Sequence, residues 1–555
     1  MFVGAVPREK RILKILVQTL EKCYNGFLKF FLRQSIMATT SQKPLPDMEE
    51  TLSSHQQETS SKTTFKPNIN QPKIKEINRQ QMLMRTVEIQ NLIPEDHEAR
   101  AIWEFVGKLD LSAFYQDIRT LEGSAGRSCL SPQLLVSIWV YAYCRGVGYA
   151  REVARLIEFD PAFQWLTGMT LINHHTLSDF RVDHQEALNQ MLIEVLGVLS
   201  AEGLITLKRV AQDGTKIKAY ARSSSFRREQ RIQEHLAEAK QQVEVLNESL
   251  LPEEFSARKM RTAQERVKNL ELALQELEKI RAVKKTAKEK EQARVSETDP
   301  EARIMKQSDG GFAPSYNVQI STDSHSGIIV GVEVVQAGND THELVPGVEK
   351  VEENCGKKPD QVLVDAGFTN KESIQEMADR KIDLIGSLSH PDFSSRAKGK
   401  GIDPEFTVKA FHYNKETDTY TCPAGQKLIF QWKTKEKGQD VYRYHPTTNV
   451  CQNCPFQKKC CPTEPKAGRS ISRCVGSPAV AAFKEKMETD EAKKLYKKRG
   501  PLAEFSNLWI KCKLKLRQFV LRGLKKVNME AKWACVTTNI QKWIERKWKP
   551  LWVTM

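Results

Sequence analysis

The chain has 555 residues, enough for two or more domains, and this length excludes a small scaffold that depends on disulfides for stability. Its composition, 40% hydrophobic and 28% charged, is that of a globular protein without the ~20-residue apolar stretch of a membrane-spanning helix. The 85 Lys and Arg residues exceed the 69 Asp and Glu residues by 16, and such a surplus favours phosphate backbones as partners.

Residues 1–95 are predicted to form a basic helix and a disordered leader. Residues 1–36 fit one amphipathic basic helix, which is interrupted by polar residues and lacks the cleavage pattern of a signal peptide. Residues 38–80 are rich in Ser, Thr, Gln, Lys and Pro, a composition that cannot bury enough apolar surface to offset the entropy of ordering. Met37 is an alternative start to Met1. A cytoplasmic location is expected.

Residues 96–204 are predicted to form an all-helical domain. Apolar residues recur at helical spacing, and Ser131 with Pro132 gives a cap followed by proline at the first helical position. Another helix is expected to begin near Thr176, after a turn. This spacing fits a helix-turn-helix that places Arg181 on DNA, and it equally fits ordinary packing of helices.

Two heptad stretches within residues 226–290 predict a coiled-coil hairpin inserted into the next domain. Their apolar residues alternate in steps of three and four. These residues are Ile232, Leu236, Ala239, Val243, Leu246 and Leu250 in the first stretch, and Met260, Ala263, Val267, Leu270, Leu274 and Leu277 in the second. The turn is expected near Pro252. The charged flanks suit a solvated structural arm, or an arm that contacts DNA or a partner.

Residues 205–225 and 305–395 are predicted to hold the first part of an α/β domain. Their apolar runs and turn signals give the series β, β, β, α, β, α, β, with Thr341 as the cap of the first helix. Such a series predicts a mixed sheet covered by helices. Residues 396–475 are predicted to be a cysteine-rich insert, and residues 476–555 to be helices that complete the domain.

Three acidic residues stand out. Asp213 in VAQDGTK and Asp365 in VLVDAGF each end a short apolar run, which predicts a buried strand that delivers an Asp to its carboxyl edge. Glu504 lies in a helical stretch. Such residues can converge on divalent cations, which prefer oxygen ligands and keep positions open for phosphate oxygens and water. A lone Asp at a strand end is otherwise usually a turn former or helix cap.

The twelve cysteines do not form a disulfide framework, because several lie singly in apolar helical surroundings. The others gather in the cysteine-rich insert. Cys422 is followed by Cys451-x2-Cys454, and then by the adjacent Cys460 and Cys461. This pattern matches structural zinc bound by four thiolates, with Cys460 or Cys461 as the fourth ligand. Reduced thiols without metal are the alternative.

Several extended motifs together resemble a DDE transposase of a bacterial insertion sequence, in the branch with a cysteine cluster between the second Asp and the Glu. They are DGTKIKAYA, TDPEARIMKQSDGGFAPSYNVQIS, VLVDAGFTNKES and LRGLKKVNMEAKWACVTTNIQKW. The resemblance extends from about residue 96 to residue 545. It implies a ribonuclease-H-like core with a mixed five-stranded sheet, preceded by the helical domain and interrupted by the coiled-coil hairpin and the cysteine-rich insert.

The resemblance also implies the site residues. Asp213, Asp365 and Glu504 correspond to the catalytic triad, with two Mg²⁺ ions as cofactor, for which Mn²⁺ can substitute. Such families often place a Tyr and an Arg before the Glu and a Lys after it. Arg499 and Lys511 match these positions as DNA contacts.

The helical position of these residues follows from their spacing. Lys511 lies seven residues after Glu504, which predicts a shared helix face, whereas Arg499 is expected before that helix begins, because Gly500 and Pro501 follow it. Glu530, the rival to Glu504 as the third acid, is predicted to pack or form an ion pair.

The implied reaction is in-line attack on a DNA phosphorus, first by water and then by the freed 3′-hydroxyl. The implied partners are double-stranded DNA, as terminal inverted repeats and target, and a second copy of the chain, because two ends must be paired. A nucleoid-associated location follows. Two alternatives are a catalytically degenerate descendant that acts as a repressor or architectural protein, and a nuclease that cuts without joining.

Overall fold

The computed structural model describes residues 78–553, with the exception of 83, 85, 117, 119–127, 249–252, 388–398, 437–438, 448–449, 464–467 and 475–476. The predicted basic helix, most of the predicted leader and the hairpin turn at Pro252 therefore lie outside the described residues. The chain divides into two units between Met84 and Arg85, and the following description concerns the second. Within the described residues, no helix has the length and apolar character needed to cross a membrane.

Helices make up the described part of residues 86–204, so ordered structure begins before residue 96, within the predicted leader, where Ile93 is buried. They are η1 (Ile89–Leu92), α2 (Glu98–Val106), α3 (Ser112–Tyr115), α4 (Pro132–Cys144), α5 (Ala150–Phe159), α6 (Pro161–Thr167), α7 (His174–Asp183) and α8 (Gln185–Ala201). Every side chain of α4 from Leu135 to Tyr143 is buried. The cause is packing on several sides, by α2, α6, α7 and the C-terminal helix α18 (Leu524–Trp543).

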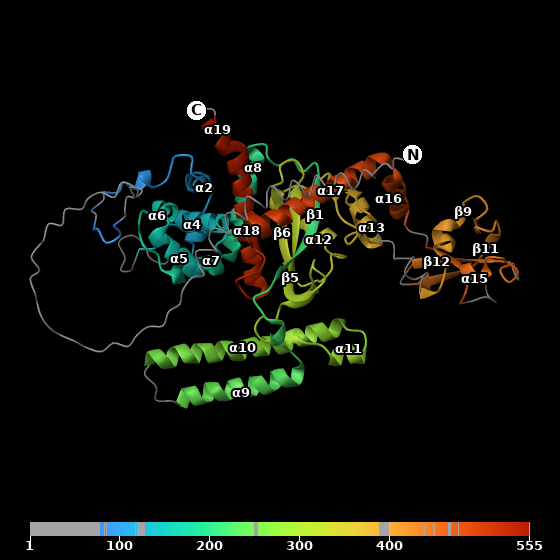
Figure 1. The fold of residues 1–555 in the computed structure, drawn as a ribbon, viewed down its shortest axis with the longest axis horizontal. Coiled ribbons are helices and arrows are strands. Elements are labelled where there is room, and N and C mark those ends of the chain that lie inside the picture. The colour runs from blue at the N-terminus through green and yellow to red at the C-terminus, as the bar shows by residue number, and fades with distance from the viewer. Residues whose placement is uncertain are drawn as a thin grey trace, which may run out of the picture. The chain divides into compact units, whose positions relative to one another are not determined.

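A mixed sheet of six strands forms the α/β part of the chain, and Figure 1 shows its members β1, β5 and β6 side by side. The strands are β1 (Val210–Lys218), β4 (Arg303–Lys306), β5 (Phe312–Asp323), β6 (Ile329–Val335), β7 (Gln361–Leu363) and β8 (Asp383–Ile385). β5 pairs antiparallel with β1, β6 and β4, whereas β7 is parallel to β1 and β8. The path β6-β5-β1-β7-β8 is consistent with a ribonuclease-H-like core.

The sheet has one strand more than the five predicted. The cause is the length of β5, which pairs with β6 only between Asn317 and Thr322. The earlier residues of β5, from Phe312 to Ser315, pair with β4. Because unpaired backbone groups in a sheet are costly to bury, the free edge of the long strand takes a second, short partner.

Helices cover both faces of the sheet. Ala211 of β1 and Leu363 of β7 pack with Ala503 of α17 (Asp490–Leu508) on one face. Val362 and Val364 belong to a different cluster, which includes residues of α12 (Leu344–Cys355), α13 (Lys371–Asp379) and α16 (Pro478–Glu488). Successive side chains of a strand point to opposite faces, so the apolar run before Asp365 packs against the helices on both faces of the sheet. α18 packs against β6 and joins the sheet to α4 and α8.

Two helix starts differ from the predictions. The helix predicted to begin at Thr341 begins at Leu344, and Glu343 occupies its cap position. α17 begins at Asp490, where the Thr489 side chain accepts a hydrogen bond from the N–H of Ala492. The prediction that Arg499 precedes this helix is therefore wrong. A strong cap far upstream starts the helix, and Pro501 lies inside it.

The end of α17 also departs from regular spacing. The helix continues at Trp509–Lys513 as a π-helical turn, in which the N–H of Leu514 donates to the carbonyl of Trp509 at 3.1 Å. Lys511 lies in this wider turn and still lines the same cavity as Glu504, in agreement with the predicted shared face. A second π-helical turn (Ile544–Trp548) and α19 (Lys549–Val553) follow α18.

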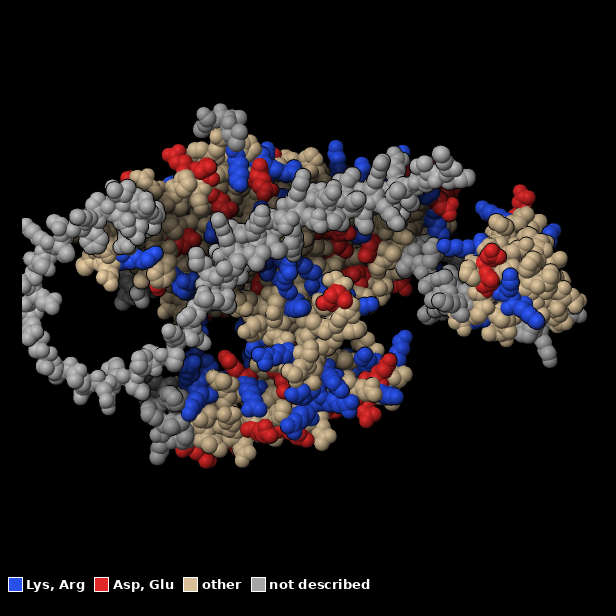
Figure 2. All heavy atoms as spheres, in the orientation of Figure 1, with Lys and Arg blue, Asp and Glu red and all other residues tan. Residues whose placement is uncertain are grey.

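Between β1 and β4 the chain forms two long helices, α9 (Glu229–Glu248) and α10 (Glu253–Val283). Ion pairs join Glu229 to Arg281 and Lys240 to Glu271, which shows that the helices run in opposite directions. Apolar residues at the predicted heptad positions pack between them. Figure 2 shows Lys and Arg side chains mixed with acidic ones over this hairpin. Three short elements flank the hairpin in the chain. β2 (Phe226–Arg227) precedes α9, and α11 (Ala287–Glu291) and β3 (Val295–Ser296) follow α10.

A buried carboxylate connects the hairpin to the sheet. Glu276 of α10 is 1% exposed, and it forms ion pairs with Lys279 and with Arg303 of β4. Replacing Glu276 by Ala should lower the free energy of unfolding by about 3 kcal/mol, because it leaves the partly buried Arg303 without its anion. Urea denaturation measures this effect. The exposed neighbour Glu278 is the matched control, and an equal, small effect of both substitutions would contradict this role of Glu276.

The described residues between 399 and 474 contain a separate antiparallel sheet, in the order β13-β12-β11-β10-β9. Its strands are β9 (His412–Asn414), β10 (Thr419–Thr421), β11 (Lys427–Glu436), β12 (Gln439–Pro446) and β13 (Ile471–Cys474). The short helices η3 (Pro404–Phe406), η4 (Val408–Ala410) and α15 (Gln457–Cys460) accompany it. We call these residues the cysteine module.

Candidate active site

Asp213 lies within β1, between β5 and β7, and is partly buried. Its Oδ2 accepts a hydrogen bond of 2.8 Å from the side-chain amide of Asn507 on α17. Burial raises the pKa of Asp213 to about 6; Asp365 and Asp340 also raise it, while the Arg499 guanidinium acts in the opposite direction. The carboxylate therefore lies in a crowded, charged environment.

Asp365 follows β7 and lies on the same face of the sheet as Asp213. The parallel pairing aligns Ala211 with Leu363, and each Asp comes two residues after this pair, so both side chains point to the α17 side. The effect of Asp365 on the pKa of Asp213 shows that the two carboxylates are neighbours. The Oδ1 of Asp365 also accepts a hydrogen bond of 2.7 Å from the N–H of Gly367, so it forms a turn as well.

Glu504 is exposed on α17 and lines a cavity of about 610 Å³ together with Asn507 and Lys216. Asn507 lies one helical turn after Glu504 and bonds to Asp213, so the same helix contributes to the cavity wall and to the Asp213 site. The structure thus places Glu504 on the helix that contacts Asp213, but it does not bring three described acidic side chains close enough together to hold a metal ion.

Basic side chains surround the same cavity. Lys216 and Lys218 of β1, Lys511 and Arg517 all line it. Burial lowers the pKa of Lys511, and Asp213 opposes that shift, which places the ammonium group near the carboxylate. Arg499 also acts on Asp213. Lys and Arg groups so close to paired carboxylates suit a ligand whose phosphates carry negative charge.

The donors suit a hard divalent cation. Asp213 and Asp365 are like-charged carboxylates in a partly buried site, and a cation between them would remove the repulsion that contributes to the raised pKa. Oxygen donors of this kind are those that Mg²⁺ prefers. Within the described residues, no three His, Cys, Asp or Glu side chains are arranged closely enough to hold a metal ion. Glu504 would have to approach the Asp pair to complete a three-carboxylate site.

Asp340 is a further acidic residue of the site that the sequence did not reveal. Its Oδ1 accepts hydrogen bonds from Asn317 at 2.8 Å and from Gln319 at 2.6 Å, both on β5. A Cβ atom at Gly214, next to Asp213, would come within 2.3 Å of this oxygen, so only glycine fits there. Asp340 lies in the loop between β6 and α12, where no apolar pattern precedes it, and only the folded sheet brings it to Asp213.

Arg181 of α7 is buried, with 3% of its surface exposed. Its guanidinium donates to the carbonyl of Gly148 and lies 4.4 Å from the ring centre of Trp139. The prediction that Arg181 faces DNA is therefore wrong, because α7 directs this side chain into the helical core. Glu530, also buried, accepts hydrogen bonds from the N–H groups of Val520 and Leu521, in agreement with the predicted packing role.

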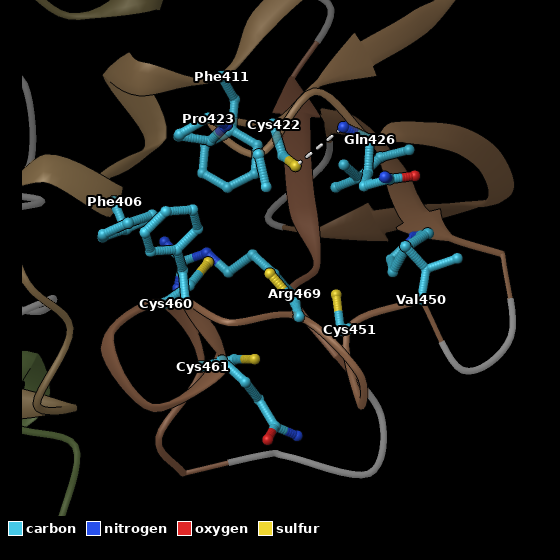
Figure 3. Close-up of a pocket in the computed structure, with 16 residues that line it drawn as sticks. Phe406, Phe411, Cys422, Pro423, Gln426, Val450, Cys451, Cys460, Cys461 and Arg469 are labelled. Atoms are coloured by element: carbon cyan, nitrogen blue, oxygen red, sulfur yellow. Dashed lines mark hydrogen bonds between the residues drawn. The ribbon is translucent and has the colours of Figure 1, made fainter.

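The cysteine module contains a second cavity, shown in Figure 3, which five cysteines line. They are Cys422, Cys451, Cys454, Cys460 and Cys461. The candidate zinc ligands and the alternative Cys461 therefore share one cavity. The aromatic rings of Phe406 and Phe411 form part of its wall.

Two family models match the chain. One describes a transposase DDE domain and matches residues 421–544, which include Glu504, Lys511 and the five cysteines. The other describes a transposase domain, DUF772, and matches residues 87–183, which include α2 to α7. Asp213 and Asp365 lie between the two matched ranges. No curated protein matches the chain.

Proposed function

Because the chain belongs to the DDE-type transposases of insertion sequences, we propose that it binds the terminal inverted repeats of its element, cleaves the DNA there and joins the ends to a target by Mg²⁺-dependent phosphoryl transfer. The observation that carries this proposal is the pair Asp213 and Asp365 on one face of the sheet, beside a basic cavity that Glu504 lines. Paired carboxylates next to Lys and Arg side chains suit metal-assisted chemistry on a phosphodiester.

Each residue has a distinct role in this proposal. Asp213, Asp365 and Glu504 would hold the magnesium ions. When bound, the magnesium ions would activate the attacking oxygen and stabilise the leaving oxygen. Lys511 and Arg499, which interact electrostatically with Asp213, would bind the oxygens of the scissile phosphate.

The remaining positive charge would hold the DNA backbone. Lys216, Lys218 and Arg517 line the cavity that leads along β1 and would contact phosphates on either side of the cleaved bond. Pairing the two ends of an element requires two active sites, so we propose that the chain acts as a homodimer on double-stranded DNA. Association with the nucleoid follows from this substrate.

A strand-cleavage assay tests the proposal. Labelled duplexes with the ends of the element are incubated with the full chain and Mg²⁺, Mn²⁺ or EDTA. We expect nicked and strand-transfer products with either metal and none with EDTA. Binding without cleavage in all conditions would identify a degenerate DNA-binding protein, and cleavage without joining would identify a nuclease. Either result would overturn the proposed transposition activity.

Magnesium should stabilise the protein through Asp213. The pKa of this group is 3.8 in the unfolded reference and about 6 when folded, so the folded state binds the proton more tightly. Stability therefore falls as pH rises from about 4 to about 6, and ionised Asp213 costs up to about 3 kcal/mol at neutral pH. The variant D213N should melt at a higher temperature than the wild type without metal.

Thermal melting at pH 7.5, with and without Mg²⁺, checks this expectation. Mg²⁺ should raise the melting temperature of the wild type, because it neutralises the repelling carboxylates, and should have little effect on D213N. The exposed Asp379 on α13 supplies the control, and D379N should respond to Mg²⁺ like the wild type. An identical Mg²⁺ response in D213N would exclude Asp213 as a ligand.

A further inference from the structure

The cysteine module has a small hydrophobic core. One cluster of buried side chains consists of Phe411, Leu428, Tyr444 and Ile471, and a second consists of Ile402 and Phe406. A unit of about 75 residues with so few buried apolar side chains usually needs an additional cross-link, which a disulfide or a bound metal can supply. The five cysteines that line the cavity of Figure 3 are unpaired thiols.

These thiols come from three separate parts of the module and line one cavity. Cys422 follows β10, Cys451 and Cys454 lie in the segment between β12 and α15, and Cys460 ends α15. Figure 3 shows the sulfur atoms of Cys422, Cys451 and Cys460 directed into the cavity. A cross-link at this point would join the sheet to the α15 segment, which the two small clusters hold only weakly.

The backbone around two of these residues is shaped to accommodate sulfur. The N–H of Gln426 donates to the Sγ of Cys422 at 3.3 Å, and Gly425 at φ +76° closes the turn between them. Gly468, at φ +77°, lies so close to Cys451 that an added Cβ atom would be 3.1 Å from its sulfur. An N–H donor directed at a sulfur stabilises the thiolate form that binds metal.

A positive charge lies in the same cavity. Arg469 lines it and stacks on Phe411, with 5.9 Å between the guanidinium carbon and the ring centre. The Nε of Arg469 is buried and has no hydrogen-bond partner among the described residues. Arg469 is half-buried, and a guanidinium that is partly removed from water in this way is stabilised by a neighbouring anion. Four thiolates around one Zn²⁺ carry a net charge of −2 and would supply it.

We propose that Cys422, Cys451, Cys454 and Cys460 bind one structural Zn²⁺ ion, with Arg469 as the compensating charge. Cys460 is assigned in preference to Cys461 because Cys460 packs against the same apolar cluster as Cys422, whereas Cys461 does not belong to that cluster. The described thiols are not close enough to coordinate an ion in the present conformation, so their side chains turn inward on binding. Each thiol releases its proton to solvent when the metal binds.

Metal analysis of the full chain, purified under reducing conditions without added metal, tests the site. We expect about one Zn²⁺ per chain. Replacement by Co²⁺ should give the intense visible absorption of tetrahedral thiolate coordination. These measurements use the wild-type protein and do not depend on the proposed transposition. Less than a tenth of an equivalent of metal, even after incubation with Zn²⁺, would overturn the proposal.

Variants test the ligand assignment. C422S, C451S, C454S and C460S should each lose zinc, whereas C461S, in the same cavity, and C535S, buried in α18, should retain it. Where a variant does not fold, the Co²⁺ spectrum of the wild type decides whether a four-thiolate site exists. Loss of zinc in C461S together with its retention in C460S would overturn the assignment of the fourth ligand.

Discussion

Replacing Asp213 by Asn is expected to lower DNA cleavage by about 10³-fold or more while leaving binding to the inverted repeats unchanged. The amide keeps the size of the side chain and can still accept the hydrogen bond from Asn507, so the fold around β1 should persist. It cannot supply the negative charge that holds a divalent cation. Cleavage rates and gel-shift titrations on the same DNA measure the two effects separately.

Asp365 should behave like Asp213, because both carboxylates point to the same side of the sheet. D365N is therefore expected to give a similar loss of cleavage. D379N, on the exposed part of α13, should cleave at the wild-type rate and controls for a general effect of lost negative charge. Wild-type cleavage by D213N would remove Asp213 from the mechanism, whatever the binding data show.

Glu504 and Glu530 should respond in opposite ways to substitution by Gln. E504Q is expected to lose cleavage by about 10²-fold or more with unchanged stability, because Glu504 is exposed on the cavity wall and packs against nothing that a neutral amide would disturb. E530Q should cleave at the wild-type rate per folded molecule with little loss of stability. Burial raises the pKa of Glu530 to about 7, and the amide oxygen of Gln can still accept the backbone N–H groups of Val520 and Leu521.

Comparing the two variants by cleavage rate and by urea denaturation decides which glutamate is the third acid. The result also tests the geometry, because Glu504 lines the basic cavity but the described acidic side chains are not arranged closely enough to hold a metal ion. Full cleavage by E504Q, combined with loss of activity but not of stability in E530Q, would transfer the catalytic role to Glu530. The catalytic roles proposed for Asp213 and Asp365 would be unchanged.

Features that depend on local pattern could be predicted from the sequence. The heptad spacing predicted two helices, and α9 and α10 occupy those residues because their apolar stripes bury each other. The apolar runs before Asp213 and Asp365 predicted strands, since each run packs against helices of the core. Asp365 follows its strand as predicted, whereas Asp213 lies within β1 and not at its carboxyl edge, because pairing with β5 continues to Lys218.

Features that depend on distant partners could not be predicted in this way. Asp340 joins the site only because Asn317 and Gln319 of β5 bind its carboxylate. Arg181 is of a residue type that often contacts DNA, but its side chain packs on the ring of Trp139 and donates to the carbonyl of Gly148 inside the helical core. In both cases the deciding atoms lie more than twenty residues away in the chain.

The π-helical turn at Trp509–Lys513 makes the position of Lys513 and Arg517 relative to Glu504 sensitive to chain length. A π turn is equivalent to one extra residue in an otherwise regular helix. Deleting Cys512, whose side chain is exposed, would restore regular geometry and rotate everything downstream by roughly 100°. Related insertion sequences whose transposase genes differ by one codon at this turn should therefore place a different basic residue against the phosphate. A point substitution cannot produce this change.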